Sequence, residues 1–122
     1  KVGIGTTDFS GDHKLRVEGS IGAREIKVEA GTGWSDFVFY DNYELPTLVE
    51  VENHIKEKGH LKDIPSEAEV TENGINLGEM NAKLLQKVEE LTLYLIEQNK
   101  QLMKANQNIS ALQKEVSVLK EK

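Results

Sequence analysis

The chain has no cysteine, no long apolar run and few basic residues, and each shortage excludes a class of protein. Without cysteine there is neither a disulfide scaffold nor a thiolate metal site. No stretch approaches the roughly 20 consecutive apolar residues that span a membrane. The formal net charge of -6 argues against nucleic acid or an anionic membrane as a partner, because both require a basic surface. The sequence therefore predicts a soluble chain whose partners are proteins.

The chain also begins without a methionine or a signal-peptide pattern. Its first five residues, Lys1 to Gly5, already alternate as a strand does, which indicates the C-terminal piece of a longer polypeptide. The last third of the 122 residues is predicted to form one long, rod-like helix. About 75 residues then remain for a compact part. We therefore expect a small head that buries little core by itself.

From Leu84 to the end of the chain, apolar residues recur every seven residues, with a single break at Gln98. Alternating steps of four and three place them on one narrow stripe of a helix, which is the pattern of a coiled coil. A chain of this size has no second long helix to cover the stripe, so we expect an oligomer. The stripe, called the seam below, comprises Leu84, Val88, Leu91, Leu95, Gln98, Leu102, Ala105, Ile109, Leu112, Val116 and Leu119.

The seam alternates between heptad positions a and d, with Val88 at a and Leu84 at d. Its mixture of leucine and β-branched residues at a does not settle the number of helices. Gln98 costs stability in a buried layer, yet it fixes the register if symmetry-related copies bond one another. Glu115 at g and Lys120 at the next e form an opposite-charge pair only between parallel neighbours, which favours parallel packing.

Residues 1–33 contain most of the glycines, interleaved with short alternating runs. The runs predict strands at 15–17, 21–23 and 26–28, with glycine turns between them and at 31–33. Strands this short make a poor sheet alone. We therefore expect a β-rich stem that is intertwined with neighbouring chains.

Residues 34–75 are expected to form a compact collar with short helices. Five of the seven aromatic residues lie within 34–43. One amphipathic helix is predicted with Pro46 in its first turn and Gly59 at its end, and an extended link then leads to a helix capped by Ser66. The expected collar core is Trp34, Phe37, Phe39, Tyr43, Leu48, Val51 and Ile55.

The third zone, residues 76–122, is predicted to be one long helix. Asn76 and Glu79 form the capping pattern at its start. Four apolar residues near this start lie off the seam, so we expect the collar to fold back onto the first turns of the coiled coil. They are Leu85, Leu93, Tyr94 and Ile96.

Several runs in these zones resemble a known family. The runs are Trp34–Phe39, Tyr43–Pro46, His60–Leu61, Ile64–Ser66 and, above all, Asn73–Tyr94. Over about residues 2–100 they resemble the C-terminal tail-fibre-type domain of bacterial surface and fibre proteins. More distantly, the architecture is similar to the endosialidase-type intramolecular chaperone of phage tail fibres, which trimerises the fibre and is then often cut off.

Together with the seam, this resemblance implies an α+β homotrimer with an intertwined β-rich stem, a small helical collar and a C-terminal parallel coiled coil. The implied function is trimerisation and assembly at the C-terminal end of a fibrous surface, secreted or tail-fibre protein. Its partners are two copies of itself and the upstream fibre of the same polypeptide. The implied location is extracellular, on a cell surface or a virion-like fibre.

Three alternatives accompany this interpretation. Exposed Trp34 or Tyr43 would suit a tip that binds a glycan or a cell-surface receptor, and an anchoring module of the fibre fits equally. The third is self-cleavage, because the related phage chaperone cuts before a serine in a Ser-Asp context that basic residues follow. Ser35 and Asp36 match only this dipeptide, since Phe37 and its neighbours replace the basic positions. We expect Ser35 to cap a turn and Asp36 to bond local backbone, without cleavage.

No other catalytic or cofactor site is predicted. A metal ion could be bound near the end of a helix by His54, His60 and Asp63. Lone histidines at such a position more often cap the helix or lie in solvent, so we do not expect a metal site. The glycine pairs lack the further glycine or lysine of a phosphate loop. We therefore expect a protein that is not an enzyme and that carries neither metal nor cofactor.

Overall fold

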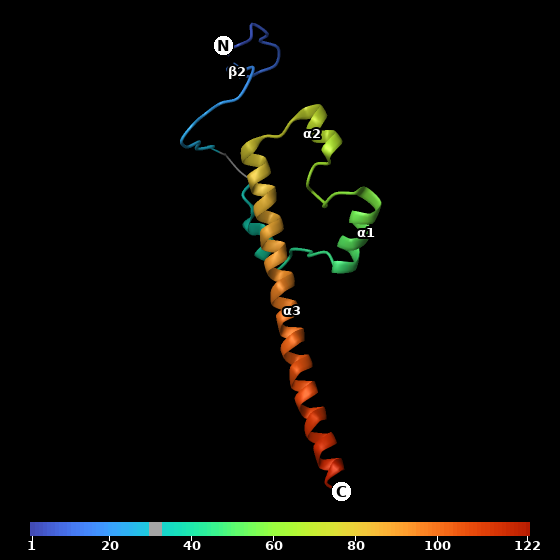
Figure 1. Ribbon diagram of the computed structural model, residues 1–122. Helices are drawn as coiled ribbons and strands as arrows, with labels where there is room; N and C mark the ends of the chain where they lie inside the picture. The colour runs from blue at the N-terminus through green and yellow to red at the C-terminus, as the bar shows by residue number, and fades with distance from the viewer. Residues whose placement is uncertain (30–32) are drawn as a thin grey trace.

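The computed structural model, which describes residues 1–29 and 33–122, consists of one long helix with smaller elements beside its N-terminal half (Figure 1). The elements are β1 (Val2–Ile4), β2 (Leu15–Val17), the 3-10 helix η1 (Ser35–Phe39), α1 (Leu48–Lys58), α2 (Glu67–Asn73) and α3 (Leu77–Lys120). This mixture of helices and a small sheet is compatible with the predicted α+β class. The coiled coil and the trimer stay predictions.

The stem contains a single pair of short strands within the described residues. β1 and β2 pair in parallel, with Val2 opposite Leu15. The Nζ of Lys1 donates to the carbonyl oxygens of Phe9 (3.0 Å) and Gly11 (2.7 Å), which closes the connection between the strands. The strand at 15–17 is thus confirmed.

The strands predicted at 21–23 and 26–28 do not form within the chain. The physical reason is that no other strand of residues 1–29 and 33–122 lies beside them, and a lone strand leaves its N–H and C=O groups unpaired. Most of the predicted turn at 31–33 falls outside the described residues.

Helix α1 begins after Thr47, so Pro46 precedes the helix and does not lie in its first turn as predicted. Thr47 Oγ1 accepts a hydrogen bond from the Glu50 N–H (3.1 Å), and the Glu50 carboxylate accepts one from the Thr47 N–H (3.2 Å). This reciprocal pair is a capping box, which sequence reasoning missed. Gly59 ends the helix with a φ of 77°, as predicted.

Helix α2 confirms the predicted cap, because Ser66 Oγ accepts from the Glu69 N–H (3.3 Å). The link before it is not extended as predicted. The Ile64 N–H donates to the Leu61 carbonyl (3.2 Å), and Asp63 adopts a φ of 68°. The link is therefore a tight turn.

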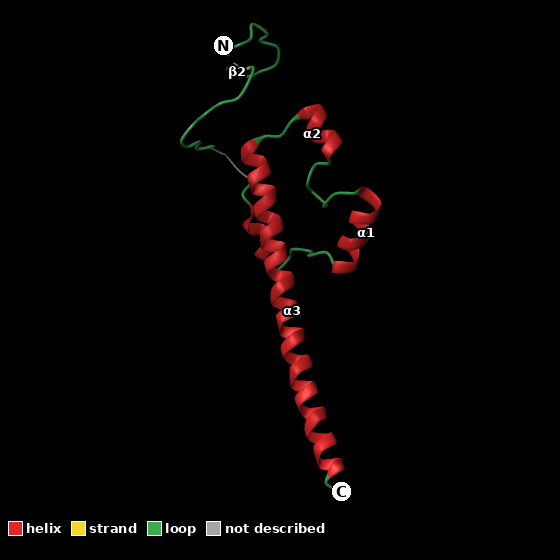
Figure 2. Cartoon of the chain, viewed as in Figure 1, coloured by secondary structure: helices red, strands yellow, loops and turns green. Residues whose placement is uncertain are grey.

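Helix α3 runs for 44 residues, about 66 Å. It starts after Asn76 as predicted, although the Asn76 side chain donates to Glu79 Oε2 (3.3 Å) and caps no backbone N–H. The C-terminal half of α3 stands free of the other elements that the structure describes (Figure 2). Among the described residues, no helix is both long and apolar enough to cross a membrane.

The hydrophobic core within one chain is very small. Over the described part of the chain, Val38 of η1 is the one buried apolar side chain, at 2% exposure. A Cβ at Gly78 would lie 2.7 Å from Val28 Cγ1, so the stem touches the first turn of α3 there. With so small a core, most of the large apolar side chains are exposed in the single chain.

Candidate functional site

Every seam residue is exposed in the single chain. The large apolar side chains of the seam range from 49% exposure at Leu84 to 68% at Leu95. Leu77, at 50% exposure, extends the d positions by one heptad toward the N-terminus. Sequence reasoning missed Leu77 because polar Asn81 occupies the intervening a position. The candidate site is thus an uncovered apolar stripe along the whole of α3.

The 3-10 helix η1 packs on the face of α3 that lies opposite the seam. Ser35 Oγ donates to the carbonyl oxygen of Ala82, and Asp36 lies beside the Glu89 carboxylate. Ala82 and Glu89 both occupy heptad position b, away from the a and d positions of the seam. The contact therefore attaches the collar to α3 and leaves the seam uncovered.

Ser35 does not cap a local turn as predicted. Trp34 occupies the cap position of η1 and makes no side-chain cap bond. Ser35 is 1% exposed, and its bonding partner Ala82 lies 47 residues further along the chain. No local pattern carries information about so distant a partner, which is why the prediction was wrong.

A polar cluster of Tyr43, Asp63, Gln86, Lys87 and Glu90 joins the collar to α3. The Tyr43 hydroxyl donates to Glu90 Oε1. Gln86 Nε2 donates to the Tyr43 hydroxyl (3.3 Å), to Glu90 Oε1 (3.3 Å) and to Asp63 Oδ2 (3.5 Å). Lys87 Nζ lies 3.2 Å from Glu90 Oε2 and 3.9 Å from Asp63 Oδ2. Because Gln86 and Glu90 are buried and find their partners within the cluster, the cluster fixes the path of the collar.

Two tyrosines hold the collar chain against α3. Burial raises the pKa of Tyr43 to about 12, with a further contribution from its bond to Glu90. Burial also raises the pKa of Tyr94, whose hydroxyl donates to the Pro46 carbonyl (2.6 Å). Both hydroxyls therefore keep their protons, and these hydrogen bonds, at neutral pH.

The expected collar core is only partly covered within one chain. The rings of Phe37 and Tyr43 pack with centroids 5.7 Å apart, and both residues are half-buried, as is Val51. The remaining four are mostly exposed, namely Trp34 (61%), Phe39 (54%), Leu48 (47%) and Ile55 (45%). Their burial stays a prediction about the assembly.

The collar folds back onto α3 through η1 and the polar cluster, as predicted, whereas helices α1 and α2 stand away from α3 (Figure 1). Neither helix contains a buried residue. Residues 46–63, called the arm below, leave α3 at Pro46 and return to it at Asp63. A cavity of about 300 Å³ lies between the arm and α3, lined partly by His54 and Lys87.

The two histidines of the arm pack against each other. The rings of His54 and His60 meet edge to face with centroids 5.6 Å apart, and His60 Nδ1 lies 2.9 Å from the Leu61 carbonyl oxygen. Asp63 is engaged by Gln86 and Lys87 instead. Throughout residues 1–29 and 33–122, no three His, Cys, Asp or Glu side chains are grouped to hold a metal ion.

We expect Glu89 to make docking of the collar dependent on pH. Burial raises the pKa of its carboxyl, and the neighbouring Asp36 carboxylate raises it further. Because the folded state binds this proton more tightly than the unfolded chain, the resulting stabilisation is complete below the ordinary pKa of 4.5 and is lost as the pH rises through the elevated value. We expect thermal melts followed by circular dichroism to show higher stability just below pH 4.5 than at neutral pH.

The variant Glu89→Gln is expected to remove that pH dependence and to raise the melting temperature at neutral pH. The matched control is Glu97→Gln, on the exposed part of the same helix. A pH dependence that persists in Glu89→Gln would show that another group is responsible.

The chain was also compared with known proteins. Comparisons with protein-family models, with curated proteins and with solved structures found no match. The resemblance to tail-fibre-type domains stays a prediction, and the function has to be inferred from the seam and the collar.

Proposed function

We propose that this chain is a homotrimerisation and assembly domain that brings three polypeptides into parallel register through the seam of α3. The observation that carries the proposal is the position of the seam. Its large apolar side chains are 49–68% exposed, while the collar contacts the opposite face of the same helix. Burying one such side chain contributes about 1.5–3 kcal/mol, so the stripe supplies a large driving force for association.

The length of α3 supports the same conclusion. Its last turns have no contact with any other described element. An amphipathic helix is stabilised mainly by packing of its apolar face rather than by intrinsic propensity. Partner helices along the seam would provide that packing.

Three parallel copies are favoured over two by the family resemblance of the runs at 34–39 and 73–94. Leu85 at position e and Tyr94 at position g widen the apolar stripe, as expected for a helix that meets two neighbours. Such a trimer, at the end of an extracellular fibre, is an intramolecular-chaperone-like assembly domain.

The stem gives the assembly role its physical basis. A coiled coil forms from contacts that are local in sequence, whereas β-pairing between chains is non-local and slow. Once the seam holds three C-termini together, the effective concentration of partner strands rises into the millimolar range. The segments at 21–23 and 26–28, which have no strand partner in the described part of the chain, would then pair between chains.

One thiol per chain tests the register directly, because the natural sequence has no cysteine. Ala105→Cys places that thiol in a d layer of the seam. We expect oxidation, or a short bifunctional thiol reagent, to give covalent dimers from an in-register parallel assembly. Gln107→Cys, at the outer f position, is the matched control and should not cross-link. An Ala105→Cys chain that stays monomeric under these conditions contradicts the proposal.

Gln98 provides a second test of the seam. Replacing the polar layer by Gln98→Leu is expected to raise the melting temperature by at least about 5 °C, because a desolvated amide becomes an apolar contact. The specificity of the register should fall, so that cross-linking of Ala105→Cys becomes less complete in the double variant. A lower melting temperature would place Gln98 outside a buried layer.

A binding tip is the second candidate function, and the exposure of Trp34 favours it. Trp34 is 61% exposed and borders a cavity of about 860 Å³ together with Val28 and Phe37. It is the single tryptophan, so its fluorescence reports directly on this position. Red-shifted emission in the assembled protein that shifts on titration with a panel of oligosaccharides would support glycan binding. Blue-shifted emission without such a response would place Trp34 in a contact between chains.

A further inference from the structure

We propose that the arm of each chain packs against the neighbouring chain, on the e and b side of that neighbour's α3. The inference rests on the proposed parallel association through the seam. It adds a second contact between chains, outside the coiled coil, and it assigns a role to exposed apolar residues that the seam does not use.

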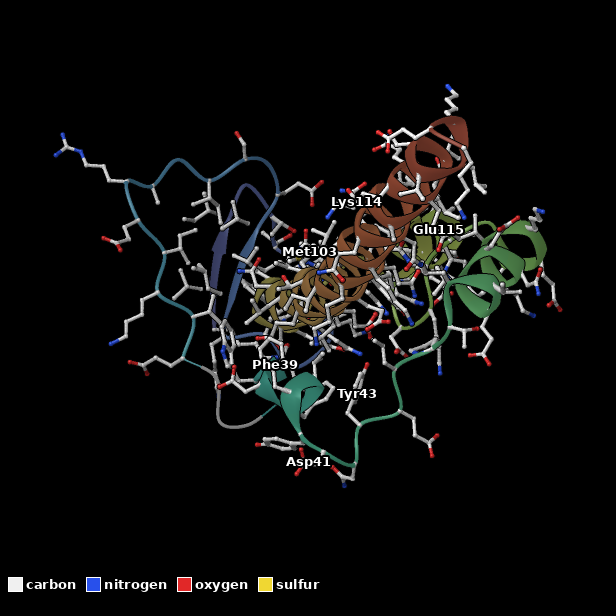
Figure 3. The ribbon with its side chains drawn as sticks, turned by 90° about the horizontal axis from the view of Figure 1, so that it is seen from below. Phe39, Asp41, Tyr43, Met103, Lys114 and Glu115 are labelled. Atoms are coloured by element: carbon white, nitrogen blue, oxygen red, sulfur yellow. The ribbon has the colours of Figure 1, made fainter. Side chains whose placement is uncertain are left out.

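The path of the collar around α3 determines where the arm projects. η1 is bonded at Ala82, in position b, and Tyr43 is bonded at Glu90, in position c. The two ends of the arm then contact Tyr94 and Lys87, which both occupy position g. The chain thus crosses the outer face of α3 from b to g. In Figure 3, η1 with Phe39 is followed by Tyr43, and α1 lies on the side of Tyr43 away from Phe39.

Coiled-coil geometry places a neighbour beside this flank. In a parallel pair, the g positions of one helix lie next to the e positions of its neighbour, and b follows e around the helix. An arm that projects from the g flank therefore reaches the e and b side of the next chain. On that side the neighbour presents Ile96, at position b and 48% exposed, and Phe39 of its η1, 54% exposed.

The arm needs such a contact for its own stability. Helix α1 has 11 residues, whereas isolated helices shorter than about 12–15 residues are marginal in water. Leu48, Val51 and Ile55 recur at helical spacing along one face, and none of them is buried. Val51 borders the cavity between the arm and α3, whereas Leu48 and Ile55 of the same face are exposed and so are free for another copy of the chain.

The contacts of the arm with α3 also determine how far along the axis of α3 the contact between chains occurs. Pro46 is bonded at the level of Tyr94, so Leu48 lies within about one turn of the level of Ile96. Within one chain, residue 96 points about 200° away from residue 94 around the helix axis. Leu48 therefore cannot meet its own Ile96, but it can meet the Ile96 of a neighbour in register.

A cysteine pair tests this contact. The full chain carrying Leu48→Cys and Ile96→Cys is expected, on mild oxidation, to give disulfides between chains and to move mostly to multimeric bands on a denaturing gel. A mixture of the two single variants should give covalent dimers that contain one chain of each kind. Val49→Cys with Ile96→Cys is the matched control, since residue 49 lies about 100° from the apolar face of α1, and it should cross-link much less.

The seam variant Ala105→Cys distinguishes the proposed assembly through the seam from the proposed contact of the arm. If Ala105→Cys cross-links but Leu48→Cys with Ile96→Cys stays uncross-linked or closes within one chain, the arm contact is overturned and the seam assembly stands. If neither variant cross-links and the mass is that of one chain, both proposals fail. Cross-linking of both variants supports both contacts.

Discussion

Replacing Leu91 and Leu95 by aspartate is expected to convert the assembly into monomers. Both side chains are exposed in the single chain, at 59% and 68%, so the monomer itself tolerates the change. In the assembly each aspartate would bring a carboxylate into an apolar layer, at a cost of several kcal/mol per chain. We expect light scattering to show one chain, and circular dichroism to show loss of helix from the free end of α3.

The stem should lose its order in the same variant, because the proposed function makes the seam the organiser of the stem. The matched control is Lys100→Asp with Gln107→Asp, which introduces two aspartates at f positions outside the seam. A chain with Leu91→Asp and Leu95→Asp whose stem amides stay protected from hydrogen exchange in a trimer would show that the seam is not the organiser.

Val38→Asp is expected to release η1 from α3. Val38 is 2% exposed, and a carboxylate at this position would be desolvated without a partner. We expect a loss on the order of 3–5 kcal/mol in the free energy of docking, enough to expose residues 34–46 to proteases. The measurement is limited proteolysis together with hydrogen exchange of the same segment.

The seam lies on the opposite face of α3, so Val38→Asp should still assemble at high concentration. Asn42→Asp, an exposed change four residues away, is the matched control and should leave the collar protected. Unchanged proteolysis of Val38→Asp would show that Val38 does not hold the collar in solution.

The features predicted correctly from the sequence are those that depend on neighbours along the chain. The start of α2 at Ser66 and the end of α1 at Gly59 follow from residues that cap helix ends. The uninterrupted helix under the seam follows from a repeat of seven residues. Each of these patterns is formed by residues close together in the sequence, so it can be recognised without knowing the fold.

The polar contacts of the collar could not be predicted in this way. Tyr43 and Glu90 are 47 residues apart, as are Ser35 and Ala82, so each pair becomes neighbours only after the chain has crossed α3. Gln86 and Glu90 are buried at 9% and 6% exposure, although polar residues on the outer face of a helix ordinarily indicate solvent. Burial of this face was therefore unpredictable without the position of η1.

The separation of the arm from α3 has a different cause. The spacing of Leu48, Val51 and Ile55 correctly indicates an amphipathic helix, but periodicity does not identify the surface that covers the apolar face. The prediction of a collar that folds back onto the first turns of the coiled coil did not say which chain covers this face. Within one chain, η1 alone among the described elements of the collar packs on α3.

The measurement that tests trimerisation most directly is the mass of the native assembly by multi-angle light scattering over a dilution series. The full chain is expected to give three times its mass of 13.7 kDa, and a chain that ends at Asn81, before the seam, is expected to be monomeric. A full chain that runs as a monomer would contradict the proposed function. An oligomer that survives removal of the seam would also contradict it and would move the organising role to the stem.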